Sequence, residues 1–137
     1  MMLASSMNNR FKFRVWDKLA KRMIYPHNDN QQHFIIDLNG RFHNLQNGSG
    51  GDDYVIQPYT GLNDSNDDPI YEGDILKNHY DVGNNIIGQV LYESDHGGYI
   101  FQWKRRGQDY KITNLNCDVA FHSAIVGNIF EHSELLK

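Results

Sequence analysis

Apolar and polar residues alternate strictly over residues 11–16, which read Phe-Lys-Phe-Arg-Val-Trp. This period of two predicts a strand whose first, third and fifth side chains form one buried face. The other face then holds Trp16 beside two cations. Residues 17–18 favour a turn, and residues 23–25 are apolar again before a proline. The pattern therefore predicts a first β-hairpin over residues 11–25.

A second hairpin is indicated by two apolar runs, residues 34–38 and 41–45, that flank Asn39-Gly40. Asn-Gly is a strong hairpin signal, because a two-residue turn of this kind needs positive φ at both central positions. The following stretch, residues 47–53, is rich in glycine and aspartate. Such a composition is typical of a loop and makes this stretch a candidate boundary between two subdomains.

The rest of the chain repeats the same alternation of short apolar runs and turn residues. Runs with strand character lie at residues 54–57, 74–80, 86–93, 99–104 and 119–131. The pair 86–93 and 99–104 is expected at the centre of a sheet. Because no window of eleven or more residues has a helical period, we predict an all-β protein, either a small barrel or a sandwich.

Length and composition agree with this class. The 137 residues include 39% apolar and 12% aromatic side chains, enough for one domain or two small ones. We divide the chain into an N-terminal hairpin region, residues 10–57, and a C-terminal domain, residues 58–137. Cys117 is the single cysteine, which favours a reducing compartment. Since no signal peptide or membrane-spanning run is visible, we expect a cytoplasmic protein without membrane contact.

The charge of the chain is unevenly distributed. Residues 1–60 carry seven basic and five acidic side chains, whereas residues 61–137 carry six basic and twelve acidic ones. A basic stretch runs from Arg10 to Arg22. Separated charges of this kind allow copies of a chain to pair head to tail, or offer a basic patch to phosphate. The alternative is an ordinary solvated hairpin face.

Several segments, taken in order, resemble the YopX family of small proteins encoded by bacteriophages and prophages. The matching segments are Arg14-Val15-Trp16-Asp17, Met23-Ile24-Tyr25, Tyr59-Thr60-Gly61-Leu62-Asn63-Asp64, Ile70-Tyr71-Glu72-Gly73-Asp74-Ile75, Ile125-Val126-Gly127-Asn128-Ile129-Phe130-Glu131 and Glu134-Leu135-Leu136. The resemblance implies N-terminal β-hairpins followed by a C-terminal SH3-like small β-barrel. It also implies a protein of phage origin that acts inside a bacterial host. It implies no established activity and therefore no catalytic residues.

Metal and catalytic sites are each less well supported than a structural interpretation. An EF-hand loop starting at Asp64 would need glycine at its sixth position and glutamate at its twelfth, where Pro69 and Ile75 stand. The seven histidines lack the spacing of zinc ligands, and nothing around Cys117 suggests a nucleophile. We therefore expect no metal, no cofactor and no enzymatic activity.

Four residues are expected to serve the backbone rather than chemistry. Glu72 and Asp74 flank a glycine and could form a catalytic carboxylate pair, but a turn into a strand explains all three residues more simply. We expect structural turn roles at Gly61, Gly73, Asp74 and Gly127.

Two aromatic residues lie beside cations and are candidates for contact with another molecule. Trp103 precedes Lys104, Arg105 and Arg106, and Trp16 shares a strand face with Arg14. Aromatic rings stack on bases while cations contact phosphate, so both sites are compatible with single-stranded nucleic acid. Trp103 also shares a strand face with two other aromatics, which is typical of a core residue.

We therefore expect a non-enzymatic interaction module that self-associates or docks a phage or host protein. In a homo-oligomer, Arg14, Trp16 and Asp17 are the expected interface residues. The alternative is a small β-barrel that binds single-stranded nucleic acid through Trp16, Trp103, Arg105 and Arg106.

Overall fold

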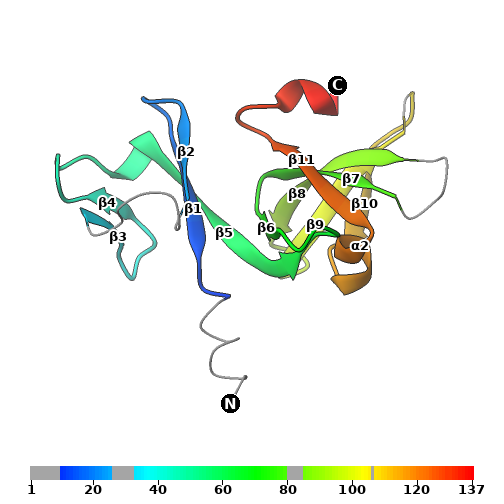
Figure 1. Ribbon diagram of the computed structural model, residues 1–137, viewed down its shortest axis with the longest axis horizontal. Coiled ribbons are helices and arrows are strands. Elements are labelled where there is room, and N and C mark those ends of the chain that lie inside the picture. The colour runs from blue at the N-terminus through cyan, green and yellow to red at the C-terminus, as the bar shows by residue number, and fades with distance from the viewer. Residues whose placement is uncertain (1–9, 26–32, 80–84, 106) are drawn as a thin grey trace, which may run out of the picture. The chain divides into compact units, whose positions relative to one another are not determined.

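A computed structural model describes residues 10–25, 33–79, 85–105 and 107–137 of the chain (Figure 1). The prediction of an all-β protein is confirmed: the described residues form eleven β-strands and helices of at most five residues. The chain divides into two compact units, Met1–Pro58 and Tyr59–Lys137. The glycine-rich stretch 47–53 lies within the first unit.

The first unit contains two separate sets of antiparallel strands. Strands β1 (Phe13–Asp17) and β2 (Arg22–Ile24) form the predicted first hairpin, and β1 also pairs with the first part of β5 (Tyr54–Asn63). Strands β3 (Phe34–Ile36) and β4 (Phe42–Asn44) form a separate two-stranded sheet. The short 3-10 helix η2 (Gly51–Asp53) leads into β5.

Both faces of β1 are buried, which differs from the sequence prediction of a single buried face. Val15 packs in a core cluster with Ile24 and Phe42, as the alternation predicted. On the opposite face, however, Arg14 and Trp16 are also buried, with 2% and 9% of their surfaces exposed. A period of two identifies which side chains share a face, but it does not show that a polar face is covered.

The β3–β4 hairpin has a longer turn than Asn39-Gly40 predicted. Among the residues of this turn only Gly40 has a positive φ, of 80°. The Asp37 carboxylate orders the turn instead, since its Oδ1 accepts hydrogen bonds from the N–H groups of Asn39 and Arg41 at 2.9 and 3.0 Å. An aspartate at the start of the loop thus replaces the expected two-residue turn.

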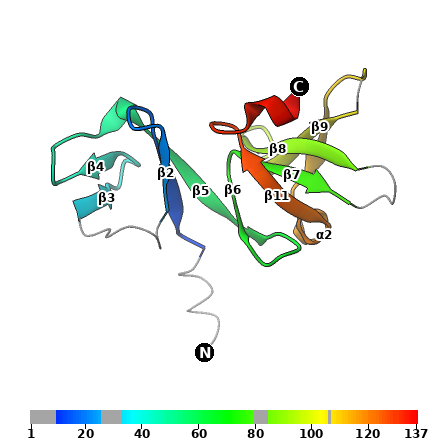
Figure 2. The same ribbon diagram turned by 45° about the horizontal axis from the view of Figure 1, so that its top comes forward.

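The second unit contains a five-stranded antiparallel sheet. Its order is β10 (Lys111–Asn114), β9 (Gly98–Lys104), β8 (Ile86–Glu93), β7 (Asp74–Asn78) and β11 (Ser123–Asn128). The predicted central pair, β8 and β9, is confirmed with seven residue pairs in register. Strand β6 (Pro69–Tyr71) pairs with the last part of β5. Figure 2 shows that the sheet is curved.

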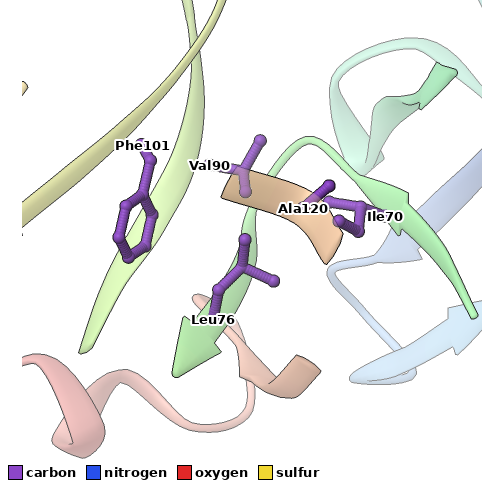
Figure 3. Packing of buried hydrophobic residues seen from close by; sticks show 5 residues of the cluster. All are labelled: Ile70, Leu76, Val90, Phe101 and Ala120. Atoms are coloured by element: carbon purple, nitrogen blue, oxygen red, sulfur yellow. The ribbon is translucent and has the colours of Figure 1, made fainter. Parts of the chain in front are cut away.

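The core of this unit lies on the concave side of the sheet. Leu76, Val90 and Phe101 come from three adjacent strands, and Ile70 and Ala120 pack against them (Figure 3). All five side chains are at most 1% exposed. Ala120 belongs to the short helix α2 (Cys117–Phe121), and the 3-10 helix η3 (Ser133–Leu136) ends the chain. Trp103 packs partly against this core, as its strand face predicted.

Three elements differ from the sequence prediction. Strand β5 does not end before Pro58 but continues through Gly61, where its register with β6 shifts, so Gly61 lies in an irregular strand and not in a sharp turn. The run 119–131 begins as the helix α2, because the Asn116 side chain accepts a hydrogen bond from the N–H of Val119 and caps it. Strand β10 was not predicted at all.

Candidate functional site

The hairpin that joins β9 to β10 groups three cations of the second unit, of which Arg105 and Lys111 are exposed and Lys104 is half-buried. Lys104, Arg105 and Lys111 lie on this hairpin, together with the aromatic residues Trp103 and Tyr110. We refer to these five residues as the basic hairpin. In Figure 2 its loop, coloured gold, extends beyond the end of the sheet.

The cations of the basic hairpin pack on its aromatic rings. Lys111 stands opposite Trp103 in the strand register, and its Nζ lies 5.3 Å from the centroid of the indole ring. The Cζ atom of Arg105 lies 5.6 Å from the same ring, and the Nζ of Lys104 lies 4.8 Å from the ring of Tyr110. Such contacts hold flexible cationic side chains in place while their charges stay accessible to water.

Trp103 itself is well fixed. It is half-buried, and its Nε1–H donates a hydrogen bond of 2.9 Å to the Oγ1 of Thr113. Two cations already occupy positions near its ring. Trp103 therefore serves mainly as a platform for Arg105 and Lys111, which leaves less of its ring for stacking on a nucleobase.

The charge of the basic hairpin contrasts with the rest of its unit. Residues 104–111 contain four basic side chains and one acidic side chain, Asp109. The remainder of residues 61–137 contains two basic and eleven acidic side chains. The hairpin is therefore a concentrated positive patch on an otherwise acidic unit, suited to a carboxylate-rich or phosphate-rich partner.

The other predicted contact residues are placed differently. Arg14 Nε donates a hydrogen bond of 2.8 Å to Gln57 Oε1 in the interior of the first unit, and Trp16 is buried on the same strand. Asp17 Oδ1 accepts hydrogen bonds from the N–H groups of Leu19 and Ala20, so it orders the β1–β2 turn. In this structure Arg14 and Trp16 are not available to another molecule. Arg106 lies outside the described residues.

The sequence pointed to Lys104 only as one of the cations that follow Trp103, and it did not point to Tyr110 or Lys111 as contact residues. Lys111 contacts Trp103 only because β10 pairs with β9 in this register. The signal for that pairing is weak, since β10 has four residues and only one of them is aliphatic.

The segment around Gly73 is a tight turn, as its composition suggested. Gly73 has a φ of 87°, and the Asp74 Oδ2 accepts a hydrogen bond of 2.8 Å from the N–H of Tyr71. The N–H of Gly73 donates to the carbonyl of Val90, and its own carbonyl accepts from Ile129. Positive φ is accessible to glycine at little cost, so this residue suits the turn.

A glycine at position 127 is needed for a different reason: the backbone there lies close to the side chain of His132. A Cβ atom at this position would lie 2.7 Å from the Cβ, Cγ and Nδ1 atoms of His132. The register of β11 with β7 also shifts between Ile125 and Gly127, which marks a β-bulge. The glycine therefore lets the chain fold back after β11.

The side chain of Glu72, in the same turn, has a shifted pKa. Burial raises its pKa above the usual value. Burial also raises the pKa of the Tyr99 hydroxyl, and the negative charges of Glu72 and Tyr92 raise it further. Asp74, by contrast, has a carboxylate that is engaged in the turn. Burial of polar groups at a tight turn is sufficient to produce these pKa shifts.

The aspartate-rich segment after β5 is a side-chain-ordered turn. Asp64 Oδ1 accepts hydrogen bonds of 2.9 Å from the N–H groups of Asn66 and Asp68. Within the described ranges, no group of three or more His, Cys, Asp or Glu side chains is arranged to hold a metal ion. Cys117 is exposed at the start of α2.

The first unit contains an apolar groove of about 360 Å³. It lies between the β1–β2 hairpin and the β3–β4 sheet and is lined by aromatic and aliphatic side chains, among them Phe11, Phe13, Ile24, Phe34 and Phe42. Of the described residues that line it, Lys12 alone is charged. The groove can accept an apolar group, but it offers little for catalysis.

The fold and this surface define a small all-β protein with a curved antiparallel sheet and an exposed basic hairpin. The chain belongs to the YopX family: the family model described as YopX protein matches residues 12–137. Among solved structures, the crystal structure of protein EF1440 from Enterococcus faecalis is similar, with a TM-score of 0.57 and 26% sequence identity. The match covers 92% of this chain and 97% of that one.

The curated proteins include no match to this chain. Among the described residues, no helix is long and apolar enough to cross a membrane.

Proposed function

We propose that this YopX family member is a non-enzymatic interaction module of phage origin that binds acidic protein surfaces through the basic hairpin. One observation carries the proposal: three cations are held on aromatic rings at an exposed hairpin, in a unit that is otherwise acidic. A cation that is already positioned loses less conformational entropy when it binds. The partner is a phage or host protein in the bacterial cytoplasm.

A second copy of this chain is one such acidic surface. Its residues 61–137 carry a net charge of −6, and the positive charges among them are concentrated in the hairpin. Head-to-tail association, in which the hairpin of one copy meets the acidic surface of the next, follows from this separation. Self-association is thus part of the proposed function.

We also propose that the second unit is an SH3-like small barrel. The order β10-β9-β8-β7-β11, in which a four-stranded meander is followed by a short helix and a strand that returns to the first, supports this assignment. In addition, Asp64 and Ser65 reach the outer edge of β11 through hydrogen bonds. These bonds are consistent with closure of the sheet through side chains and a loop.

Single-stranded nucleic acid is the second candidate partner. The combination of Trp103 with Arg105 and Lys111 favours it, because stacking and phosphate contacts occur together in such sites. Two features weigh against it. The indole ring is half-buried and already carries two cations, and the chain as a whole has a net charge of −4.

Fluorescence anisotropy tests the proposal with two labelled probes, an oligoglutamate peptide and a single-stranded oligonucleotide. The test variant reverses three charges of the hairpin: Lys104→Glu, Arg105→Glu and Lys111→Glu. The control variant makes the same change in charge at three exposed sites elsewhere: Lys18→Glu, Arg41→Glu and Lys137→Glu.

We expect the peptide to bind wild type at low salt and the test variant at least ~10-fold more weakly, since each cation contributes on the order of 0.5 kcal/mol or more. The control variant should lose clearly less. Equal losses in the two variants would contradict a role for the hairpin. Tight, salt-dependent binding of the oligonucleotide with none of the peptide would favour the second candidate.

A further inference from the structure

The two edge strands of the five-stranded sheet differ in whether their outer backbone groups are occupied. At β11, the N–H of Ile125 donates a hydrogen bond of 2.9 Å to Asp64 Oδ2, and the carbonyl of Ser123 accepts one of 2.8 Å from the N–H of Ser65. The aspartate-rich turn therefore covers this edge. An edge covered in this way cannot pair with another strand.

The edge of β10 is open in the described part of the chain. The N–H of Leu115 donates to the carbonyl of Tyr99, so the backbone groups of Leu115 face β9. Because these directions alternate along an antiparallel strand, the N–H groups of Ile112 and Asn114 face away from β9. No hydrogen bond between described residues reaches these two groups. Ile112 is also 53% exposed.

The side chains next to this edge alternate in character. Lys111 lies on the face that carries Trp103, with Arg105 close to the same ring. Ile112 belongs to the opposite face, and Tyr110, just before β10, packs against the Nζ of Lys104; both Ile112 and Tyr110 are 53% exposed. A strand added beside β10 would therefore meet Lys111 and Arg105 on one face. On the other face it would meet Ile112 and the Tyr110 ring, with Lys104 packed on that ring.

We propose that the open edge of β10 binds an extended acidic segment of a partner protein by strand addition. The matching segment alternates Asp or Glu with apolar residues, so that its carboxylates face Lys111 and Arg105 and its apolar side chains face Tyr110 and Ile112. Backbone hydrogen bonds provide affinity in this mode, and the alternating side chains provide specificity. This inference rests on the proposed function of the basic hairpin.

The same charges make a second copy of β10 a poor occupant. Pairing β10 of one copy with β10 of another would bring two sets of Lys104, Arg105 and Lys111 together in one small sheet. A lysine on a short edge strand is also a common protection against indiscriminate pairing. The edge is thus selective for a partner that neutralises these cations.

The test compares two octapeptides of equal composition on the full chain. One alternates Glu and Val, and the other has its four Glu before its four Val. We expect the alternating peptide to bind at least ~10-fold more tightly, which corresponds to roughly 1.4 kcal/mol, about the net contribution of one to two hydrogen bonds. Equal binding of the two peptides would contradict strand addition.

Two matched variants test whether binding needs the N–H of Ile112 in β10. Ile112→Pro removes an N–H that faces away from β9, so the β9–β10 ladder keeps its bonds, whereas Ile112→Thr keeps that N–H. The proline variant should lose binding of the alternating peptide by ~10-fold or more, and the threonine variant much less. A circular dichroism spectrum and a melting temperature compare the folds of the two variants.

A modified peptide tests the same point without changing the protein. The alternating peptide is N-methylated either at all Val or at all Glu positions, and only one of these sets faces β10. One methylated peptide should lose binding to wild type and the other should keep most of it; retention by both would overturn the inference.

If charge reversal at the hairpin weakens binding but neither proline nor N-methylation does, strand addition fails while the proposed function stands. If charge reversal has no effect, the proposed function itself fails.

Discussion

The carboxylate of Asp64 connects two parts of the second unit that lie 61 residues apart. Its Oδ2 accepts a hydrogen bond of 2.9 Å from the N–H of Ile125 in β11, while its Oδ1 accepts from Asn66 and Asp68 within its own turn. The residue is 5% exposed. One buried side chain thus orders a loop and covers the edge of a sheet.

Replacing Asp64 should destabilise the protein markedly. Asp64→Ala leaves three backbone N–H groups without their acceptor, and we expect a loss of about 3 kcal/mol in the free energy of unfolding. Asp68→Ala is the matched control, since Asp68 is exposed and contributes backbone groups to the turn. It should change stability by less than ~0.5 kcal/mol. Urea unfolding followed by circular dichroism measures both, and similar losses would contradict the role given to Asp64.

Gly127→Ala should be costly because the new Cβ would lie 2.7 Å from His132. We expect about 1–3 kcal/mol of destabilisation, the usual range for overpacking at a site that cannot relax freely. Gly98→Ala provides the control, because a Cβ there has no neighbour within 4 Å. Thermal unfolding of both variants measures the difference. A Gly127→Ala protein as stable as Gly98→Ala would show that His132 moves aside easily.

The β3–β4 hairpin should weaken in acid. A hydrogen bond to the His43 ring, 2.9 Å from Asp37 Oδ2, together with backbone N–H groups, holds the pKa of Asp37 below its ordinary 3.8. Since the folded pKa is the lower one, ionised Asp37 favours the folded state above pH 3.8, and this contribution is lost as the pH falls through the folded value. Asp37→Asn should therefore reduce stability at neutral pH and flatten its acid dependence below pH 4. Melting temperatures of the two proteins between pH 2 and pH 7 test this, and parallel curves would exclude it.

Self-association should depend on salt and on the basic hairpin. At an ionic strength near 0.01 M the Debye length is ~30 Å, and it shortens to ~8 Å at 0.15 M, so contacts between opposite charges weaken. Sedimentation velocity should show association of wild type at low salt and dissociation at high salt. The variant with Lys104, Arg105 and Lys111 reversed to Glu should stay monomeric at both. Oligomers that persist in this variant would place the interface elsewhere.

The alternation of side chains predicted much of this fold. It located the β1–β2 hairpin and the central pair β8–β9, because β1, β8 and β9 are long enough to show a period of two. It missed β10, whose four residues are largely polar and exposed, and α2, whose five residues are too few for a helical period. Asn116, which caps α2, was the available signal for that helix.

The site was less predictable, since its contacts join residues that are distant in sequence. Arg14 was expected on an exposed face, but Gln57, 43 residues later, binds it in the interior. Lys111 contacts Trp103 only through the β9–β10 register. The charge of residues 104–106 was visible in the sequence, but its arrangement on aromatic rings was not.

The central claim is that an acidic partner binds the β9–β10 hairpin along the open edge of β10, and amide hydrogen exchange followed by NMR tests it most directly. In the free protein, the amides of Ile112 and Asn114 should exchange fast, while those of Lys111 and Thr113 should be protected by β9. Addition of the alternating Glu-Val peptide should slow exchange at Ile112 and Asn114 and leave β11 unchanged. Exchange that is unchanged on this hairpin while another surface becomes protected would contradict the claim.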